Sequence, residues 1–149
     1  MDAILFSANL RMVNIEAAIN HLKINDKLYW EVGFRINPKR FVYPMFGYIH
    51  ICGQKVKFRV IIGDIIDFSR SHYEDKELVR LVKPTKWIEE WESNKDNIRD
   101  YHWRSVFVMK CIEPLSFDTF KFHKVEGGLV TIAPQSYVRV KNPLLHLSI

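Results

Sequence analysis

The stretch 43–68, YPMFGYIHICGQKVKFRVIIGDIIDF, constrains the fold of this chain more than any other. Two runs of β-branched and aromatic residues flank a Gly53-Gln54 step, which predicts a β-hairpin. In the first arm one face would carry Ile49 and Ile51, and the other Tyr48, His50 and Cys52. In the second arm one face would carry Val56, Phe58, Val60 and Ile62, and the other Lys57 and Arg59. A period of two is typical of half-buried antiparallel strands, so we expect this hairpin in the middle of a sheet.

Apolar runs on both sides of the hairpin predict further short elements. The expected strands are 3–6, 28–34, 103–112, 129–132 and 137–140, with Pro114 ending the third of them. Asn14 can cap a helix whose apolar face is Ile15, Ala18, Ile19 and Leu22, and a second short helix can open at Pro84-Thr85. The segment 115–122 is open between helix and strand, and Gly127-Gly128 predicts a turn. The order predicts one α+β domain, 1–149, with a curved, mostly antiparallel sheet or small barrel and a few short helices.

Length and cysteine content limit the class of protein. A chain of 149 residues fits one domain. It contains no apolar run near the roughly 20 residues that span a membrane, and no secretory leader pattern. Its two cysteines, Cys52 and Cys111, lie in apolar strand-like runs, where a free thiol behaves as a small hydrophobe. We therefore expect reduced cysteines, a cytoplasmic location and no membrane partner.

The positive charge is unevenly distributed. The chain carries +5, but 74–100 holds six basic and eight acidic residues, a net −2, which leaves +7 for the rest. This distribution is compatible with a polyanionic partner. The candidate phosphate contacts are Arg35, Lys39, Arg40, Lys55, Lys57, Arg59 and Arg70, of which the first three lie in a basic loop, 35–40. A solvated sheet face is the alternative explanation of the same pattern.

Three tryptophans are candidates for binding a planar group. Trp30, Trp87 and Trp91 are expected in or beside loops, where two indoles could enclose a base; a place in the core is the alternative. The polar turn after the first strand holds Ser7 and Asn9, which could hydrogen-bond a base edge or simply form a turn or helix cap.

Catalytic patterns are weak. The six histidines are scattered, and the pair His50/Cys52 is no zinc signature, so we expect no metal and no cofactor. A metal-dependent nuclease built from Asp64 (or Asp67), Glu74 and Lys76 is the enzymatic alternative. With no phosphate-binding glycine loop or nucleophile elbow in the sequence, we expect a binding domain rather than an enzyme.

Four passages carry a resemblance to a known family. AILFSAN, LYWEVG, FRVIIGDI and WRSVFVMKCIEPLSF resemble the EVE and YTH domains of the PUA-like superfamily, over most of the chain to about residue 140. The resemblance implies a PUA-like fold and a base pocket with Trp30 as one wall and Trp87 or Trp91 as the second. Ser7 and Asn9 match its polar turn, and Tyr29, which adjoins Trp30, is a further candidate for base binding. The Trp-Gly step of EVE domains is replaced by Trp30-Glu31-Val32-Gly33, and 69–82 has no clear counterpart.

The function that this resemblance implies is recognition of a modified base. Similar domains form the N-terminus of McrB-like GTPases in modification-dependent restriction systems, where they flip a modified DNA base. We therefore expect a module of a longer protein that binds double-stranded DNA, with N6-methyladenine the first choice and methylated cytosine the second. Any GTPase or nuclease activity, and any oligomerisation, would lie outside this chain. An RNA reader on the same fold is the alternative.

Overall fold

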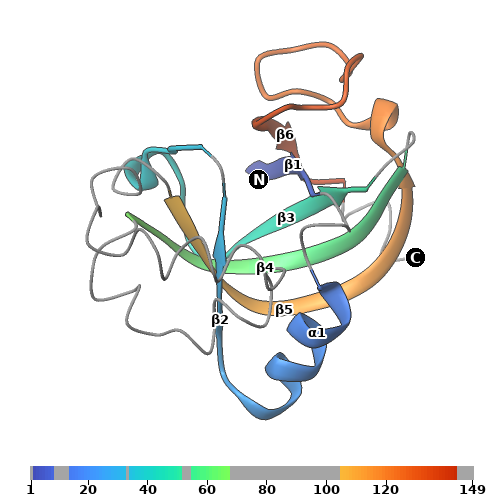
Figure 1. Ribbon diagram of the computed structural model, residues 1–149. Coiled ribbons are helices and arrows are strands. Elements are labelled where there is room, and N and C mark those ends of the chain that lie inside the picture. Colours follow the sequence, from blue (N-terminus) through green and yellow to red (C-terminus); the bar gives the residue numbers. More distant parts are fainter. Residues whose placement is uncertain (1, 9–13, 33, 52–54, 68–104, 144–149) are drawn as a thin grey trace, which may run out of the picture.

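The computed structural model describes residues 2–8, 14–32, 34–51, 55–67 and 105–143, which form one mixed sheet with few helices (Figure 1). The six strands are β1 (Asp2–Ser7), β2 (Leu28–Glu31), β3 (Met45–His50), β4 (Lys55–Asp67), β5 (Ser105–Asp118) and β6 (Tyr137–Lys141). The helices in this part are α1 (Ile15–Ile24) and two 3₁₀ turns, η1 (Pro38–Arg40) and η3 (Thr119–Lys121). This arrangement confirms the α+β class. The expected helix at Pro84-Thr85 lies outside the described residues.

The sheet order is β2-β5-β4-β3-β1-β6, so the β3–β4 hairpin is central, as its alternating pattern predicts. Neighbouring strands are antiparallel except β1 and β3, which run parallel with Ser7 opposite His50. The first strand therefore lies between the hairpin and the last strand, and Asp2 pairs with Lys141. Helix α1 begins as expected, because the Asn14 side chain accepts a hydrogen bond of 3.0 Å from the Ala17 amide.

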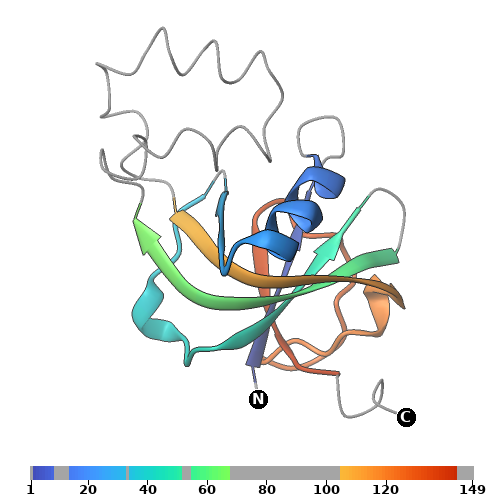
Figure 2. The ribbon, with the colours of Figure 1, turned by 90° about the horizontal axis from the view of Figure 1, so that it is seen from below.

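The two longest strands, β4 and β5, are strongly bent (Figures 1 and 2). Their pairing shifts register at three places, between Val56 and Phe58, between Ile61 and Ile62, and between Ile62 and Asp64. Such irregularities bend a strand and change which face its side chains occupy. The expectation that Val56 shares a face with Phe58, Val60 and Ile62 is therefore wrong. Val56 belongs to one core cluster, and the other three residues lie in or against another.

Strand β5 continues through Pro114, where the sequence predicted that it would end. Pro114 lies opposite Phe58, at one of the register shifts, where a residue without an amide hydrogen is tolerated. The segment 115–122, which the sequence left open between helix and strand, continues β5 up to Asp118 and then forms the 3₁₀ turn η3. The Asp118 side chain caps this turn by accepting a 2.9 Å hydrogen bond from the Phe120 amide.

Both faces of the sheet are covered. The first core cluster includes Ile4, Phe6, Trp30, Ile49 and Phe107, and α1 contributes Ile15 and Ala18 to it. The second cluster lies on the opposite face and includes Leu5, Tyr48, Phe122 and Val130. The segment after η3 covers that face. Gly127 and Gly128 turn it with positive φ values of 117° and 77°, which confirms the predicted turn. The expected strand 129–132 is absent from this described segment, where Leu129 makes only an isolated bridge to His123.

Two further findings concern the part of the chain that the structure describes. Within it, no helix is long and apolar enough to cross a membrane. Cys111, on β5, is a free thiol. Cys52 lies outside the described residues.

Candidate nucleic-acid interface

Trp30 lies within strand β2 and is only 3% exposed, so its expected place in or beside a loop is wrong. Its side chain belongs to the first core cluster. The indole meets the ring of Phe6 edge-on, with centroids 6.4 Å apart and planes inclined by 77°. Trp30 is therefore a core residue, which was the alternative expected from the sequence, and it does not offer an open stacking face.

Ser7 lies on the face of the sheet opposite Trp30. Successive strand residues alternate between faces, and Phe6 beside it points into the first core cluster. The Ser7 hydroxyl donates a 2.7 Å hydrogen bond to the carbonyl oxygen of Pro134 and lies 3.2 Å from Nδ1 of His50. Ser7 thus links β1 by a hydrogen bond to the segment after η3, which covers this face of the sheet. The structure does not bring Ser7 and Trp30 together.

Of the remaining candidates for base binding, the structure describes only Tyr29. It precedes Trp30 in β2, is half-buried, and lies beneath the Lys27 ammonium, which is 5.1 Å from the ring centroid. Asn9, Trp87 and Trp91 lie outside the described residues, so their roles remain predictions.

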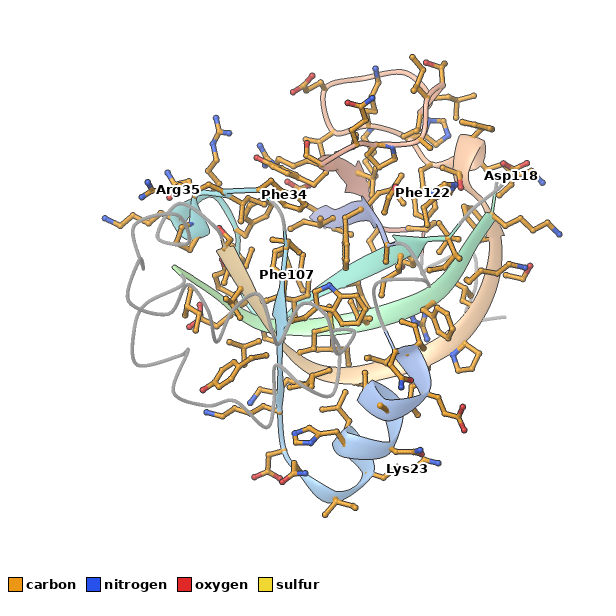
Figure 3. The ribbon with its side chains drawn as sticks, in the orientation of Figure 1. Lys23, Phe34, Arg35, Phe107, Asp118 and Phe122 are labelled. Carbon is orange, nitrogen blue, oxygen red and sulfur yellow. The ribbon has the colours of Figure 1, made fainter. Side chains whose placement is uncertain are left out.

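A series of five aromatic rings, which we call the aromatic chain, runs from the buried indole to the surface. Its members, in order of contact, are Trp30, Phe6, Phe107, Phe34 and Tyr137. Phe6 and Phe107 meet edge-on at 5.1 Å, and Phe34 and Phe107 at 6.2 Å. Figure 3 shows the labelled rings of Phe34 and Phe107 close together within the bend of the sheet.

The outer end of the aromatic chain is a stacked pair. The rings of Phe34 and Tyr137 are 5.3 Å apart with planes inclined by 29°, and both side chains are half-buried. Phe34 follows the edge strand β2 and Tyr137 begins the edge strand β6, so the stack brings the two sheet edges together. Sequence reasoning missed both residues. No local sequence pattern marks either residue, because their stack joins parts of the chain that are far apart in sequence.

The basic loop starts at this stacked pair. Ser105 anchors its beginning, since the Ser105 amide donates to the Phe34 carbonyl at 3.0 Å and the Ile36 amide donates to the Ser105 hydroxyl at 2.9 Å. The side chains of Arg35, Lys39 and Arg40 are exposed. Figure 3 shows Arg35 beside Phe34, at the outer side of the fold. The loop that begins at the outer end of the aromatic chain therefore carries three exposed cations.

The other predicted phosphate contacts lie elsewhere or are already paired. Lys55 and Lys57 are exposed on the first half of β4. Arg59 forms a hydrogen-bonded ion pair with Glu113, and its guanidinium lies 5.3 Å from the ring centroid of Phe46. The Glu113 carboxylate raises the pKa of Arg59. Arg59 is thus a structural cation with its charge compensated. Arg70 lies outside the described residues.

Of the three residues of the nuclease alternative, the structure describes only Asp64. Asp64 is exposed, and its carboxylate accepts a 2.8 Å hydrogen bond from the amide of Ile65. Glu74 and Lys76 lie outside the described residues. Among those the structure describes, no three His, Cys, Asp or Glu side chains are grouped as metal ligands.

No family model, no curated protein and no solved structure matches this chain.

Proposed function

We propose that this chain is a nucleic-acid-binding module of the PUA-like type that recognises a modified, methylated base in double-stranded DNA. In this proposal the base leaves the duplex and stacks at the outer end of the aromatic chain. The module would direct a modification-dependent restriction complex to its target, as the resemblance to EVE and YTH domains implies. The observation that carries the proposal is the half-buried Phe34–Tyr137 stack, at which a loop with three exposed cations begins.

The chemistry of this surface suits a flipped base. Stacking on an aromatic side chain contributes about 1–3 kcal/mol per base, and flipping costs a few kcal/mol. A methyl group on the base adds about 0.8 kcal/mol when it is buried. Stacking and methyl burial together are therefore of the size needed to offset flipping, while cations nearby hold the phosphates.

The structure changes the role that we propose for Trp30. Its indole is buried, whereas Phe34 and Tyr137 are partly accessible. We assign stacking to the accessible pair and assign Trp30 to support of the aromatic chain through Phe6. Trp87 and Trp91 remain the candidates for a second wall.

Binding to a matched set of oligonucleotides tests the proposal. The set comprises one duplex unmodified, with N6-methyladenine and with 5-methylcytosine, together with the corresponding RNA, all at one salt concentration. We expect tighter binding to a methylated DNA duplex than to the unmodified one. Equal affinity for all duplexes contradicts modified-base recognition, and preference for methylated RNA favours the RNA reader. A parallel incubation with Mg²⁺ should yield no cleavage products; cleavage would favour the nuclease.

A further inference from the structure

Val42 is the most exposed large apolar side chain in the described part of the chain, at 87%. Single exposed apolar residues are common, so exposure alone does not indicate a binding site. Ile24 is 86% exposed and Ile132 is 78% exposed. The difference lies in the surroundings: Val42 follows the basic loop, and the stretch 35–44, RINPKRFVYP, has three cations and no acidic residue. By contrast, Asp26 lies two residues after Ile24, and 129–136 contains no cation.

The residues around Val42 are fastened, so the loop presents this side chain in a defined position. On one side, the Phe41 ring packs against the guanidinium of Arg139, 5.5 Å from the ring centroid, and Arg139 is itself paired with Asp2 at 2.8 Å. On the other side, the Tyr43 hydroxyl donates a 2.7 Å hydrogen bond to the carbonyl of Pro38.

The Tyr43 anchor keeps its proton at neutral pH. Burial and the nearby Asp64 carboxylate raise the pKa of Tyr43 to about 12. The hydroxyl therefore remains a donor to Pro38. With Phe41 and Tyr43 both turned to the protein, Val42 is left pointing to solvent between them.

The Val42 tip belongs to the same surface as the aromatic chain. Tyr137 and Arg139 are two residues apart in β6 and therefore lie on one face of the strand. Tyr137 stacks on Phe34, before the basic loop, and Arg139 packs on Phe41, after it. Strand β6 thus holds both ends of the loop, with the stacked pair at one end and the apolar tip at the other.

We propose that Val42 is a wedge that enters the base stack of duplex DNA next to the flipped base, while Lys39 and Arg40 bind the flanking phosphates. This inference rests on the function proposed above. Apolar side chains inserted between base steps unstack them, which favours extrusion of a base. The two cations that would hold the strands form no ion pair among the described residues, and both are exposed.

An anionic membrane is the other polyanion that a basic loop with an apolar tip could meet. Membrane attachment depends on a large buried apolar area, and this tip offers the side chain of one exposed valine. The neighbouring Phe34–Tyr137 stack is suited to a planar base. Both observations favour DNA.

Binding of Val42→Ser to two duplexes tests the wedge. In the first, the methylated target base is paired; in the second, it lies opposite an abasic site and is already unpaired. Because a wedge acts by separating a stacked pair, we expect Val42→Ser to weaken binding to the paired duplex about tenfold and leave the second nearly unchanged. The matched control is Ile132→Ser, which removes a similarly exposed apolar side chain elsewhere, and Val42→Ile should retain wild-type binding. Thermal unfolding of each variant checks the fold.

Three results would overturn the wedge. Equal weakening on both duplexes makes Val42 an ordinary contact, and no weakening on either removes it from the interface. Loss of binding to phosphatidylserine vesicles by Val42→Ser, with duplex binding intact, assigns the tip to membranes. If the wild-type protein binds neither duplex, the proposed function fails as well, which separates that failure from failure of the wedge alone.

Discussion

The ring of Phe34 stacks on the ring of Tyr137 across the gap between the two edges of the sheet, at a centroid distance of 5.3 Å. The contact joins residues that are far apart in sequence, one after β2 and the other at the start of β6. It also ends the aromatic chain that begins at the buried Trp30. One ring pair therefore joins the two sheet edges and provides a half-buried aromatic surface.

Replacement of Tyr137 tests the stacking surface. We expect Tyr137→Ala to lose most of the preference for methylated over plain DNA, since one stacking ring is worth about 1–3 kcal/mol. Tyr29→Ala is the matched control, because Tyr29 is another half-buried strand tyrosine but lies outside the aromatic chain. The measurement is fluorescence anisotropy with both duplexes. A retained preference in Tyr137→Ala, or an equal loss in Tyr29→Ala, would place the pocket elsewhere.

Replacement of Trp30 should mainly affect stability. Its indole is 3% exposed and packed in the first core cluster, so Trp30→Ala is expected to lower the free energy of unfolding by about 3–5 kcal/mol. Urea unfolding followed by circular dichroism measures this loss. Trp30→Phe keeps a ring against Phe6 and should lose less. If the Trp30→Ala protein has wild-type stability but no longer selects methylated DNA, Trp30 forms a wall of the base pocket after all.

The salt dependence of DNA binding separates the basic residues. Lys39→Gln and Arg40→Gln should each reduce the slope of log affinity against log salt by about 1, because each phosphate contact releases a counterion. Arg59→Gln should leave the slope unchanged and lower stability, since Arg59 is paired with Glu113. Lys121→Gln, at the exposed turn η3, is the surface control. Titrations at several salt concentrations give the slopes, and a larger effect from Arg59 than from Arg40 would contradict this interface.

Alkaline pH should destabilise the fold through Tyr48. This residue is fully buried, and its burial raises the pKa of Tyr48 from 10.0 to about 12. Below pH 10 both the folded and unfolded states keep the proton. Between these two values the unfolded chain loses its proton and the folded chain does not, so the free energy of unfolding falls as pH rises.

Denaturant unfolding at a series of alkaline pH values measures this effect. Tyr48→Phe should be less stable than wild type at neutral pH, because the hydroxyl donates to the Asn142 side chain at 2.5 Å. It should also lose less stability as the pH rises. A pH dependence as steep as that of the wild type would show that other groups cause the alkaline loss.

Local patterns predicted the elements better than their faces. The alternation in 43–68 correctly indicated a central hairpin, and Asn14 correctly indicated the start of α1. The bends of β4 and β5 could not be predicted from the sequence, because a register shift such as that between Val56 and Phe58 depends on the paired strand. The prediction that the strand ends at Pro114 was wrong for the same reason, since a proline is tolerated in a strand where the pairing is irregular.

The candidate site was less predictable than the fold. The sequence predicted candidate aromatic and basic residues, but it could not show that Trp30 is buried and Phe34 only half-buried, because both follow from how the sheet bends. The stacked pair depends on two sheet edges meeting. Contacts between residues so far apart leave no local pattern, which is why Tyr137 was not recognised. The basic loop was recognised, because its charge is a local property.

The position of β1 has a consequence for how this chain acquires its structure. The strand is flanked by β3 on one side and β6 on the other, and its Asp2 is paired with a guanidinium 137 residues further along. The ribosome therefore releases the first strand long before one of its two neighbours exists. Contacts of such high sequence separation slow folding, so this fold should complete only after β6 has emerged. A nascent chain halted before Tyr137 should expose the outer edge of β1 to chaperones or to other nascent chains.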